Sequence, residues 1–367
     1  MVYLLCFGAS ALFAQLAYKS KIKPAIIIWS VLSIAVTVIL AGLRDYSIGI
    51  DVENYRTFRL YWGQAFASGN LGEYLKFYSR FEHEYIFALI IGCIAQYTGS
   101  FRLFLFVCHT VIITGVYIGA YRQRKNVNPA MVMLLFYLYF YSHSLNVMRQ
   151  YMAMAVVFAF LADVQEGKYI RYTIAVLVSM MIHTTAIIAI APMILYIVIG
   201  HKKYLGAPKR KKRTVVILLL CGIVLFVPLI KVIMSLGFLG GFRYFIEGDE
   251  KEWPLYLTAF LLVELFGIYV FRKQYRLSSP YSDFFLMCSI AYILLQQLGG
   301  LMNYGKRIAA YFSFLNILTI ASFAKCSRQR DNRILINTAV ISISLFYWVF
   351  FYVIKNASQT YPYVLGI

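Results

Sequence analysis

The sequence predicts an all-α protein that crosses a membrane many times, and three observations support this fold class. Of the 367 residues, 61% are hydrophobic and only 14% are charged, and the mean hydropathy of +0.71 lies above that of ordinary soluble domains. Apolar runs recur at about the 20 residues that a helix needs to cross the hydrocarbon layer. The alternating segments of about 10 residues that build a membrane β-barrel do not occur. We therefore expect a polytopic protein with roughly 12–14 transmembrane helices.

The expected spans follow one another along almost the whole chain, which we treat as one transmembrane domain, 1–367. No basic segment precedes the first apolar run, and this favours a retained span over a cleaved signal peptide. In chain order, the expected spans are 1–18, 25–43, 84–98, 101–121, 129–142, 147–163, 170–184, 185–199, 214–235, 254–271, 281–298, 306–324 and 334–354.

Basic residues concentrate in the links between these spans. Lys and Arg total 35 against 15 Asp and Glu, a formal net charge of +20. In a soluble protein this excess would favour nucleic acid as a partner, but here it reports topology through the positive-inside rule, and we expect no nucleic acid. The long link 201–213 also suits contact with anionic lipid headgroups. The other basic links, all expected to be cytoplasmic, are 19–23, 122–125, 168–171, 272–276 and 325–333.

The topology of the first third of the chain has two solutions. Three expected spans separate the basic links 19–23 and 122–125, and an odd number of crossings cannot return the chain to the same side. Either the short run 84–98 is re-entrant, or one of the two basic links faces outward.

The opposite face collects the polar loops 44–83 and 236–253, which mix both charge signs with aromatic residues. On the same face, Asn146, Arg149 and Gln150 stand at the join of two apolar runs. A charged side chain at the bilayer centre costs at least about 2.5–3.5 kcal/mol, so it usually faces a partner or a wet cavity. The alternative is that Arg149 snorkels to the lipid headgroups.

Other ionisable residues gather on this predicted face. His183 joins two apolar runs; it is either a hydrogen-bonded structural residue or a general base. Asp51 is either a solvated loop residue or a carboxylate for a sugar hydroxyl. Several cations at one wet face favour a multiply charged anion as ligand; they are Arg44, Arg149, Arg243, Lys306 and Arg307.

Motifs for metals and nucleotides are absent from the sequence. The six cysteines are scattered without a CxxC pair, and no HExxH, P-loop or GxGxxG motif occurs. We expect neither a metal site nor a cofactor.

The order of the outer-face motifs resembles the EpsG-like branch of the Wzy-type polysaccharide polymerases. Members show an Arg and then Gly-x-Asp with a later Tyr, an Asn-x-x-Arg-Gln entering a central span, and a His before a small hydroxyl residue. The matching residues are Arg44, Gly49, Asp51, Tyr55, Asn146, Arg149, Gln150, His183 and Thr184. Members also open one span with a Glu, followed by Pro-Gly and an aromatic residue. Glu82 with Tyr85 is the closer match, and Glu84 is the alternative because His83 and Glu84 replace Pro-Gly.

The resemblance implies a metal-independent glycosyltransferase, of GT-C-like architecture, on the outer face of the bacterial cytoplasmic membrane. Its donor and acceptor would be undecaprenyl-diphosphate-linked oligosaccharides delivered by a flippase, with a chain-length regulator as a further partner. Arg149, Arg44 and Arg307 would stabilise the diphosphate leaving group, and Asn146 and Gln150 would orient Arg149. Asp51, Glu82 or His183 would serve as the base.

Two other functions share this chemistry. A flippase for the same lipid-linked oligosaccharide would also need a cationic cavity, but its cations should line a path through the membrane, and the sequence shows no internal repeat. A ligase that transfers finished glycan uses the same donor, and only the order of the motifs favours the polymerase.

Overall fold

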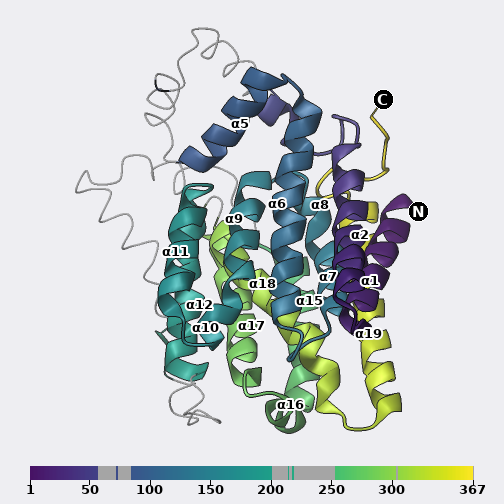
Figure 1. The fold of residues 1–367 in the computed structure, drawn as a ribbon. Coiled ribbons are helices and arrows are strands. Elements are labelled where there is room, and N and C mark those ends of the chain that lie inside the picture. The colour runs from purple at the N-terminus through teal and green to yellow at the C-terminus, as the bar shows by residue number, and fades with distance from the viewer. Residues whose placement is uncertain are drawn as a thin grey trace, which may run out of the picture. The chain divides into compact units, whose positions relative to one another are not determined.

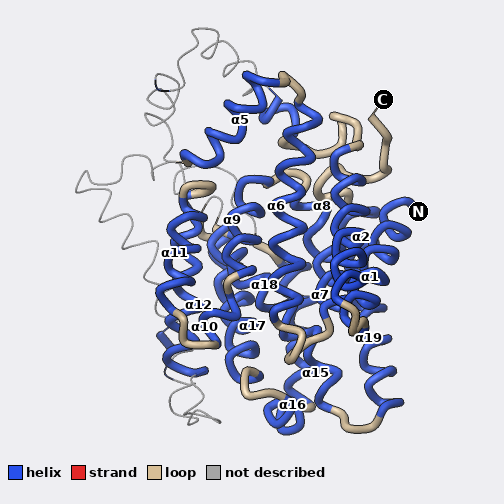
Figure 2. Tube along the Cα trace, viewed as in Figure 1, coloured by secondary structure: helices blue, strands red, loops and turns tan. Residues whose placement is uncertain are grey.

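The computed structural model describes residues 1–56, 72, 84–200, 214, 217–218, 253–302 and 305–366. Contacts divide the chain into two compact units. Unit 1 comprises Met1–Ile187 and Thr338–Ile367, and unit 2 comprises Ile188–Asn337. Both units consist of helices joined by loops (Figure 1, Figure 2). The all-α, polytopic fold class predicted from the sequence is confirmed.

Unit 1 carries the helices that position the candidate site. They are α1 (Val2–Lys19), α2 (Lys23–Gly42), α5 (Tyr85–Tyr97), α6 (Phe101–Arg122), α7 (Pro129–Phe136), the π-helical turn Tyr137–Tyr141, α8 (Ser142–Ser144), α9 (Met148–Ala159), α10 (Leu161–Gln165), α11 (Tyr169–Met180) and the last part of α19 (Arg330–Trp348), which continues as the π-helical segment Val349–Ile354.

Unit 2 has its own helical core. Its described helices are α12 (Ile190–Leu195), the π-helical turn Tyr196–Gly200, α15 (Leu255–Val270), α16 (Arg272–Ser278), α17 (Ser282–Gln296), α18 (Lys306–Ser322) and the first part of α19. Helices α15 and α16 are bent by 82° at their junction. Buried hydroxyls join the helices, as where Ser289 donates to Thr319 over 2.8 Å.

Six helices in the described part of the chain are long and apolar enough to cross a membrane, or up to seven if the bent pair α15 and α16 is one span. Three shorter apolar helices accompany them. The expected span 214–235 lies almost wholly outside the described residues. The total of 12–14 spans therefore stays a prediction.

Two expected spans are interrupted. The run expected at 129–142 begins as α7, with Pro129 in the first turn and the Asn128 side chain capping the helix over 3.0 Å. It then loosens into the π-helical turn Tyr137–Tyr141. The run expected at 147–163 breaks at Phe160 into α9 and α10. Apolar composition predicts such a run, but it does not predict a change in the hydrogen-bonding pattern within it.

The core of unit 1 combines close backbone contact with buried hydroxyls. Gly115 of α6 faces α9 so closely that a Cβ there would lie 2.7 Å from the carbonyl carbon of Ala155. On the other side of the unit, the hydroxyls of Ser10 and Tyr137 are 2.7 Å apart. The rings of Phe7 and Tyr137 stack with their centroids 5.1 Å apart. Small residues and paired hydroxyls are typical of helix packing in membranes.

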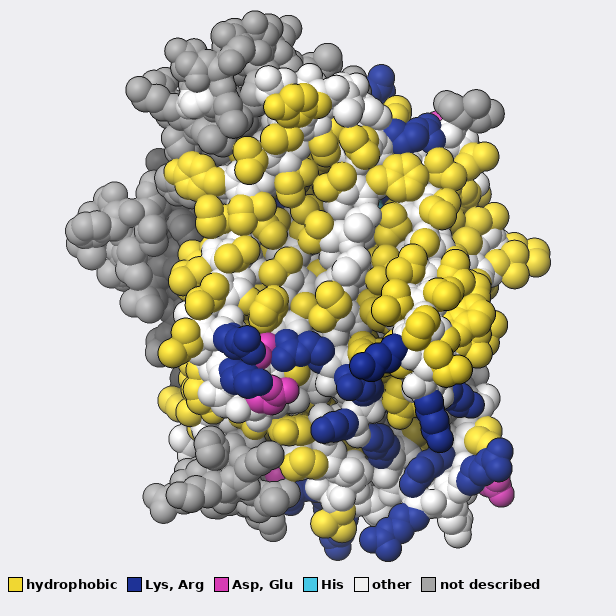
Figure 3. All heavy atoms as spheres, in the orientation of Figure 1, with side chains coloured by type: hydrophobic (Ala, Val, Ile, Leu, Met, Phe, Trp, Pro, Cys, Tyr) yellow, Lys and Arg dark blue, Asp and Glu magenta, His cyan; other side chains and the backbone are white. Residues whose placement is uncertain are grey.

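Contacts place three basic links at one end of unit 1. Ser30, early in α2, hydrogen-bonds with Tyr117, late in α6, over 2.6 Å. Arg122, the last residue of α6, forms an ion pair of 2.5 Å with Asp163 of α10, and Arg171 of α11 lies 3.9 Å from the same carboxyl group. The links 19–23, 122–125 and 168–171 therefore share one end, which the positive-inside rule predicts to be cytoplasmic. Figure 3 shows Lys and Arg side chains gathered near the end of α6 and beside α10, below a broad hydrophobic surface.

These contacts also decide between the two topologies for the first third of the chain. The backbone N–H of Ile86, at the start of α5, donates to the carbonyl of Met181, just after α11, over 2.8 Å. Met181 lies at the end opposite the basic links, and α5 runs directly into the start of α6 at that same end. With 13 residues, α5 is about 20 Å long, short of the roughly 30 Å hydrocarbon layer. It therefore begins and ends at this end of unit 1 and does not cross the layer by itself.

Candidate functional site

Three segments of unit 1 meet at the end opposite the basic links. They are the first turn of α9, which carries Arg149, the residue before α5, which is Glu84, and the turn after α11, which carries His183. We call Glu84, Arg149 and His183 the charged cluster. Its members are 34 to 99 residues apart along the chain, so only the tertiary fold brings them together.

Glu84 is the centre of the charged cluster. Its side chain is buried, with the residue 2% exposed. One carboxylate oxygen accepts from the Arg149 guanidinium over 2.8 Å. The other accepts from Nδ1 of His183 over 2.5 Å and from the backbone N–H of Thr184 over 3.1 Å. The three donors satisfy a group that would otherwise be costly to bury.

The electrostatics of the charged cluster keep Glu84 ionised. Burial acts to raise the pKa of Glu84, but the hydrogen bond from His183 and the charge of Arg149 together outweigh it, and the pKa lies below the ordinary value. At neutral pH Glu84 is therefore a carboxylate. An ionised carboxylate only accepts hydrogen bonds, so Nδ1 of His183 carries the proton of that bond.

This arrangement gives His183 a defined tautomer. With the proton on Nδ1, the neutral imidazole has its lone pair on Nε2. Nε2 is buried and has no hydrogen-bond partner among the described residues. The pair of Glu84 and His183 thus matches the orienting half of a catalytic triad, in which a carboxylate fixes the ring and the far nitrogen takes a proton.

Arg149 is held from several sides. Beside its ion pair with Glu84, the guanidinium lies 5.4 Å from the ring centroid of Phe87. It also lies within hydrogen-bonding reach of Tyr55. Its side chain keeps 21% exposure. The structure pairs Arg149 with Glu84, an internal carboxylate, and a contact of Arg149 with the substrate diphosphate stays a prediction.

The Gly-x-Asp motif forms a turn beside the charged cluster. Gly49 has φ of +109°, and a Cβ there would lie 2.5 Å from Oδ1 of Asn146, so this position requires glycine. Asn146 donates through Nδ2 to the carbonyl of Ser358 over 2.9 Å. Burial raises the pKa of Tyr55 and the charge of Asp51 raises it further, so Asp51 lies close to Tyr55 at the edge of the cluster.

Arg44 is fully buried. It donates to the carbonyls of Ala41 and Leu145, over 3.2 and 2.9 Å. Burial lowers its pKa to about 10, which leaves the group cationic at neutral pH. Arg44 thus ties the end of α2 to the loop before α9, and its role in substrate binding stays a prediction.

The other predicted site residues do not all lie in the charged cluster. Glu82 and Arg243 lie outside the described residues, and Glu84, the alternative to Glu82, occupies the cluster. Gln150 is buried in α9. Lys306 and Arg307 begin α18 in unit 2 and are partly exposed.

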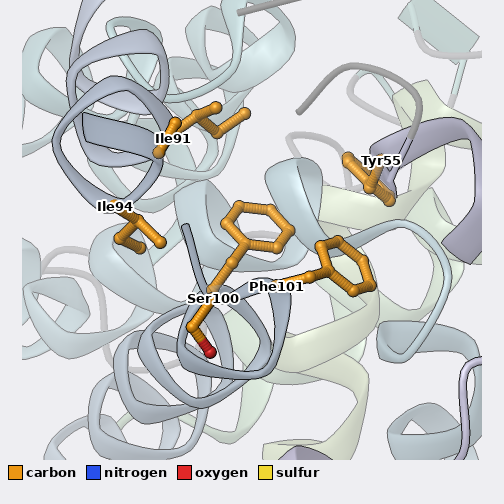
Figure 4. A pocket seen from close by; sticks show the side chains of 7 residues that line it. Tyr55, Ile91, Ile94, Ser100 and Phe101 are labelled. Carbon is orange, nitrogen blue, oxygen red and sulfur yellow. The ribbon is translucent and has the colours of Figure 1, made fainter. Parts of the chain in front are cut away.

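Sequence reasoning missed an aromatic wall next to the charged cluster. Tyr55, Phe87 and Phe104 lie ring to ring with centroids 5.9 to 6.2 Å apart. They adjoin an open pocket (Figure 4). Its empty space is about 260 Å³ when its mouth is included, but its enclosed part is about 10 Å³, which is room for about one water molecule. Its lining comes from α5, the start of α6 and the segment before residue 56, and consists of Tyr55, Ile91, Ile94, Ala95, Ser100, Phe101 and Phe104. Aromatic residues make up 17% of the sequence, so the three that form this wall cannot be told from the others by sequence alone.

Comparison with known proteins agrees with the motif order. The model of the EpsG family matches residues 27–365, which is nearly the whole chain. No curated protein and no solved structure matches, so the expected GT-C-like architecture stays a prediction. The family match supports a role as a polysaccharide polymerase in a membrane. The chain belongs to the EpsG family.

Proposed function

We propose that this protein is a glycosyltransferase that joins undecaprenyl-diphosphate-linked repeat units on the outer face of the bacterial cytoplasmic membrane. The observation that carries the proposal is the Glu84 and His183 pair, which leaves Nε2 of a buried histidine free to accept a proton at the end opposite the basic links. A base at this face suits a sugar hydroxyl that arrives from outside.

The reaction requires one bond to form and one to break. The hydroxyl oxygen of the acceptor unit attacks the anomeric carbon of the donor chain, and the bond from that carbon to the lipid diphosphate breaks. Nε2 of His183 takes the hydroxyl proton, and the electron pair leaves with the diphosphate. Glu84 stabilises the imidazolium that forms. A positioned base of this kind contributes roughly 10²–10⁴-fold to the rate.

Arg149 supports this step indirectly, by holding Glu84 in place. Its ion pair fixes the carboxylate of Glu84, and through Glu84 it fixes the imidazole ring. In this proposal Arg149 positions the base and reaches the diphosphate only through the part of its side chain that stays exposed. Of the three bases that the sequence left open, we propose His183. Asp51 is partly exposed and accepts no side-chain hydrogen bond from the residues that the structure describes, and Glu82 lies outside those residues.

The test compares His183→Gln with His143→Gln. His143 lies at the same end of unit 1 but is exposed, so it controls for the substitution. Gln at position 183 can still donate to Glu84, but it cannot take a proton. Cells that make the native repeat unit are analysed on a gel that separates lipid-linked glycans by length.

We expect a ladder for the wild type and for His143→Gln, and single repeat units for His183→Gln at equal protein level. A normal ladder for His183→Gln would show that the histidine is structural. Repeat units that accumulate on the cytoplasmic side would instead identify a flippase.

A further inference from the structure

The pocket beside the charged cluster is suited to an apolar ligand. Its walls are alkyl and aromatic groups, and the polar side chains among its lining residues are those of Ser100 and Tyr55. The Ser100 hydroxyl already accepts from the backbone N–H of Leu103 over 3.2 Å, where it caps α6. A sugar ring placed here would lose its hydrogen bonds to water without replacement. A hydrocarbon chain would not.

Two arginines converge on one tyrosine next to this pocket. The guanidinium carbons of Arg56 and Arg102 lie 5.6 and 5.8 Å from the ring centroid of Tyr46. The same ring contacts Phe101, a lining residue of the pocket, with centroids 5.2 Å apart. We call Tyr46, Arg56 and Arg102 the arginine pair site. The arginine pair site therefore places two cationic side chains next to an apolar pocket.

The existing partners of these arginines are weak or neutral. Arg56 lies 3.5 Å from Glu53, in a pair whose side chains are 50% and 70% exposed, and such surface pairs contribute little. Arg102 donates to the carbonyl of Gly366 over 2.8 Å. The charge of Arg102 also acts on Asp45, but Asp45 is partly exposed and accepts from Ser47.

The other described arginines at this end of unit 1 are engaged in buried contacts. Arg149 is paired with Glu84, and Arg44 is covered by protein. An incoming anion with several charges would therefore meet Arg56 and Arg102 first.

The position along α6 fits an amphiphilic ligand. Arg102 is in the first turn of α6, at the end opposite the cytoplasmic links, and the apolar part of this membrane span follows it. Rings connect this point to the charged cluster, because Phe101, Phe104 and Phe87 follow one another with centroids 5.6 and 6.0 Å apart. A ligand bound here would lie beside Arg149 and Glu84.

We propose that the arginine pair site binds the diphosphate of a polyprenyl diphosphate and that the first isoprene units of its chain lie across the open mouth of the adjoining pocket. This inference rests on the proposed function, since it places one lipid-linked substrate of that reaction. It moves the main diphosphate contact from Arg44 and Arg149 to residues that the sequence analysis did not consider.

Binding is measured with the purified full chain in nanodiscs of zwitterionic lipid. The probes are geranylgeranyl diphosphate, geranylgeraniol and inorganic pyrophosphate, and the diphosphate lipid should bind more tightly than either of the others. Arg56→Gln and Arg102→Gln should each weaken its binding roughly tenfold or more, because each removes a charge-assisted contact to phosphate. Ala95→Trp, which fills the pocket, should weaken the lipid but leave pyrophosphate unchanged.

Arg124→Gln is the matched control, because Arg124 also lies over a tyrosine ring, that of Tyr121 at 4.6 Å, but at the cytoplasmic end. It should bind as the wild type does. Unchanged affinity in Arg56→Gln and Arg102→Gln would overturn the inference. Equal binding of pyrophosphate and of the diphosphate lipid, insensitive to Ala95→Trp, would do so too, since it would leave an anion site without a lipid pocket. Complete displacement of the probe by an anionic phospholipid would identify a general headgroup site and would also overturn the inference.

The variants separate this inference from the proposed function. If His183→Gln loses the ladder while Arg56→Gln and Arg102→Gln lose binding of the lipid, the proposed function and the subsite are both supported. If His183→Gln keeps the ladder while Arg102→Gln loses binding, the subsite stands and the proposed base fails. If Arg56→Gln and Arg102→Gln bind normally while His183→Gln loses the ladder, the subsite fails and the proposed function stands.

Discussion

Replacing Glu84 by Gln is the most informative perturbation of the charged cluster. The two side chains have nearly the same shape, so the change removes a charge and not a volume. The Gln oxygen can accept from one side of the cluster, but its amide group is a donor and faces either Arg149 or His183, which are donors themselves. At least one buried contact therefore becomes repulsive.

The size of the effect follows from the lost contacts. Hydrogen bonds to charged groups contribute about 1.5–3 kcal/mol each, and breaking a buried ion pair costs about 3–5 kcal/mol. Arg149 keeps 21% exposure, so water partly replaces its lost partner and the lower part of this range applies. We expect Glu84→Gln to reduce the free energy of unfolding by about 2–4 kcal/mol. For a chain of 367 residues, the apparent melting temperature should then fall by roughly 3–5 °C.

The assay is thermal unfolding of the purified protein in detergent, with Glu166→Gln as control. Glu166 pairs with Lys168, but both side chains are 48% exposed, and such a pair contributes about 0–1 kcal/mol. Equal shifts for Glu84→Gln and Glu166→Gln would refute the reasoning, because they would mean that burial and the three contacts of Glu84 add nothing. A loss of the glycan ladder in Glu84→Gln alone is expected as well, since His183 would lose its orientation.

The remaining predictions concern pH, one glycine and the C-terminal segment. The pKa of Glu84 lies below its ordinary value of 4.5, so the ionised Glu84 stabilises the fold at pH values above 4.5. This stabilisation is lost as the pH falls through the lowered pKa. On acidification, the wild type should therefore lose more stability than Glu84→Gln does. Gly49→Ala should cost about 1–3 kcal/mol in unfolding experiments, and more than Gly167→Ala, since both have positive φ but only Gly49 faces a neighbour; equal costs would contradict this. Ending the chain at Asn356 removes the acceptors of the N–H of Gly49 and of Asn146, at Gln359 and Ser358, and should lower the melting temperature; an unchanged value would show that these contacts do not stabilise the fold.

Much of the fold can be predicted from the sequence because a run of about 20 apolar residues predicts a membrane-spanning helix. The runs 25–43 and 101–121 were placed within two residues of α2 and α6, since a helix satisfies its own backbone hydrogen bonds in lipid. The length of 84–98 was correctly recognised as short. The position of this helix at one end of unit 1 depends on the contact of Ile86 with Met181, 95 residues away, and no local pattern encodes that contact.

The candidate site was predictable in its residue types but not in its pairings. Arg149 and His183 were identified because ionisable groups are rare in apolar runs. Glu84 was left as the alternative to Glu82, since the two acids share the same local sequence. The choice between them depends on which one meets Arg149, and that contact spans 65 residues.

The motif residues divide into two groups by the kind of partner they meet. Gly49, Arg44 and Asn146 contact the protein backbone or pack tightly against each other, so their types are explained by the shape of the turn that they hold. Glu84, Arg149 and His183 instead satisfy one another and leave a single buried nitrogen, Nε2 of His183, without a partner in the described residues. Arg44, His109 and Asn146 also have a buried polar atom without a partner among the described residues, so a missing partner by itself does not identify a reactive group. What distinguishes Nε2 of His183 is its place on a ring whose other nitrogen is bonded to an ionised carboxylate, which is in turn paired with Arg149. This combination of a base, a carboxylate and a cation is the structural reason to expect chemistry at this point.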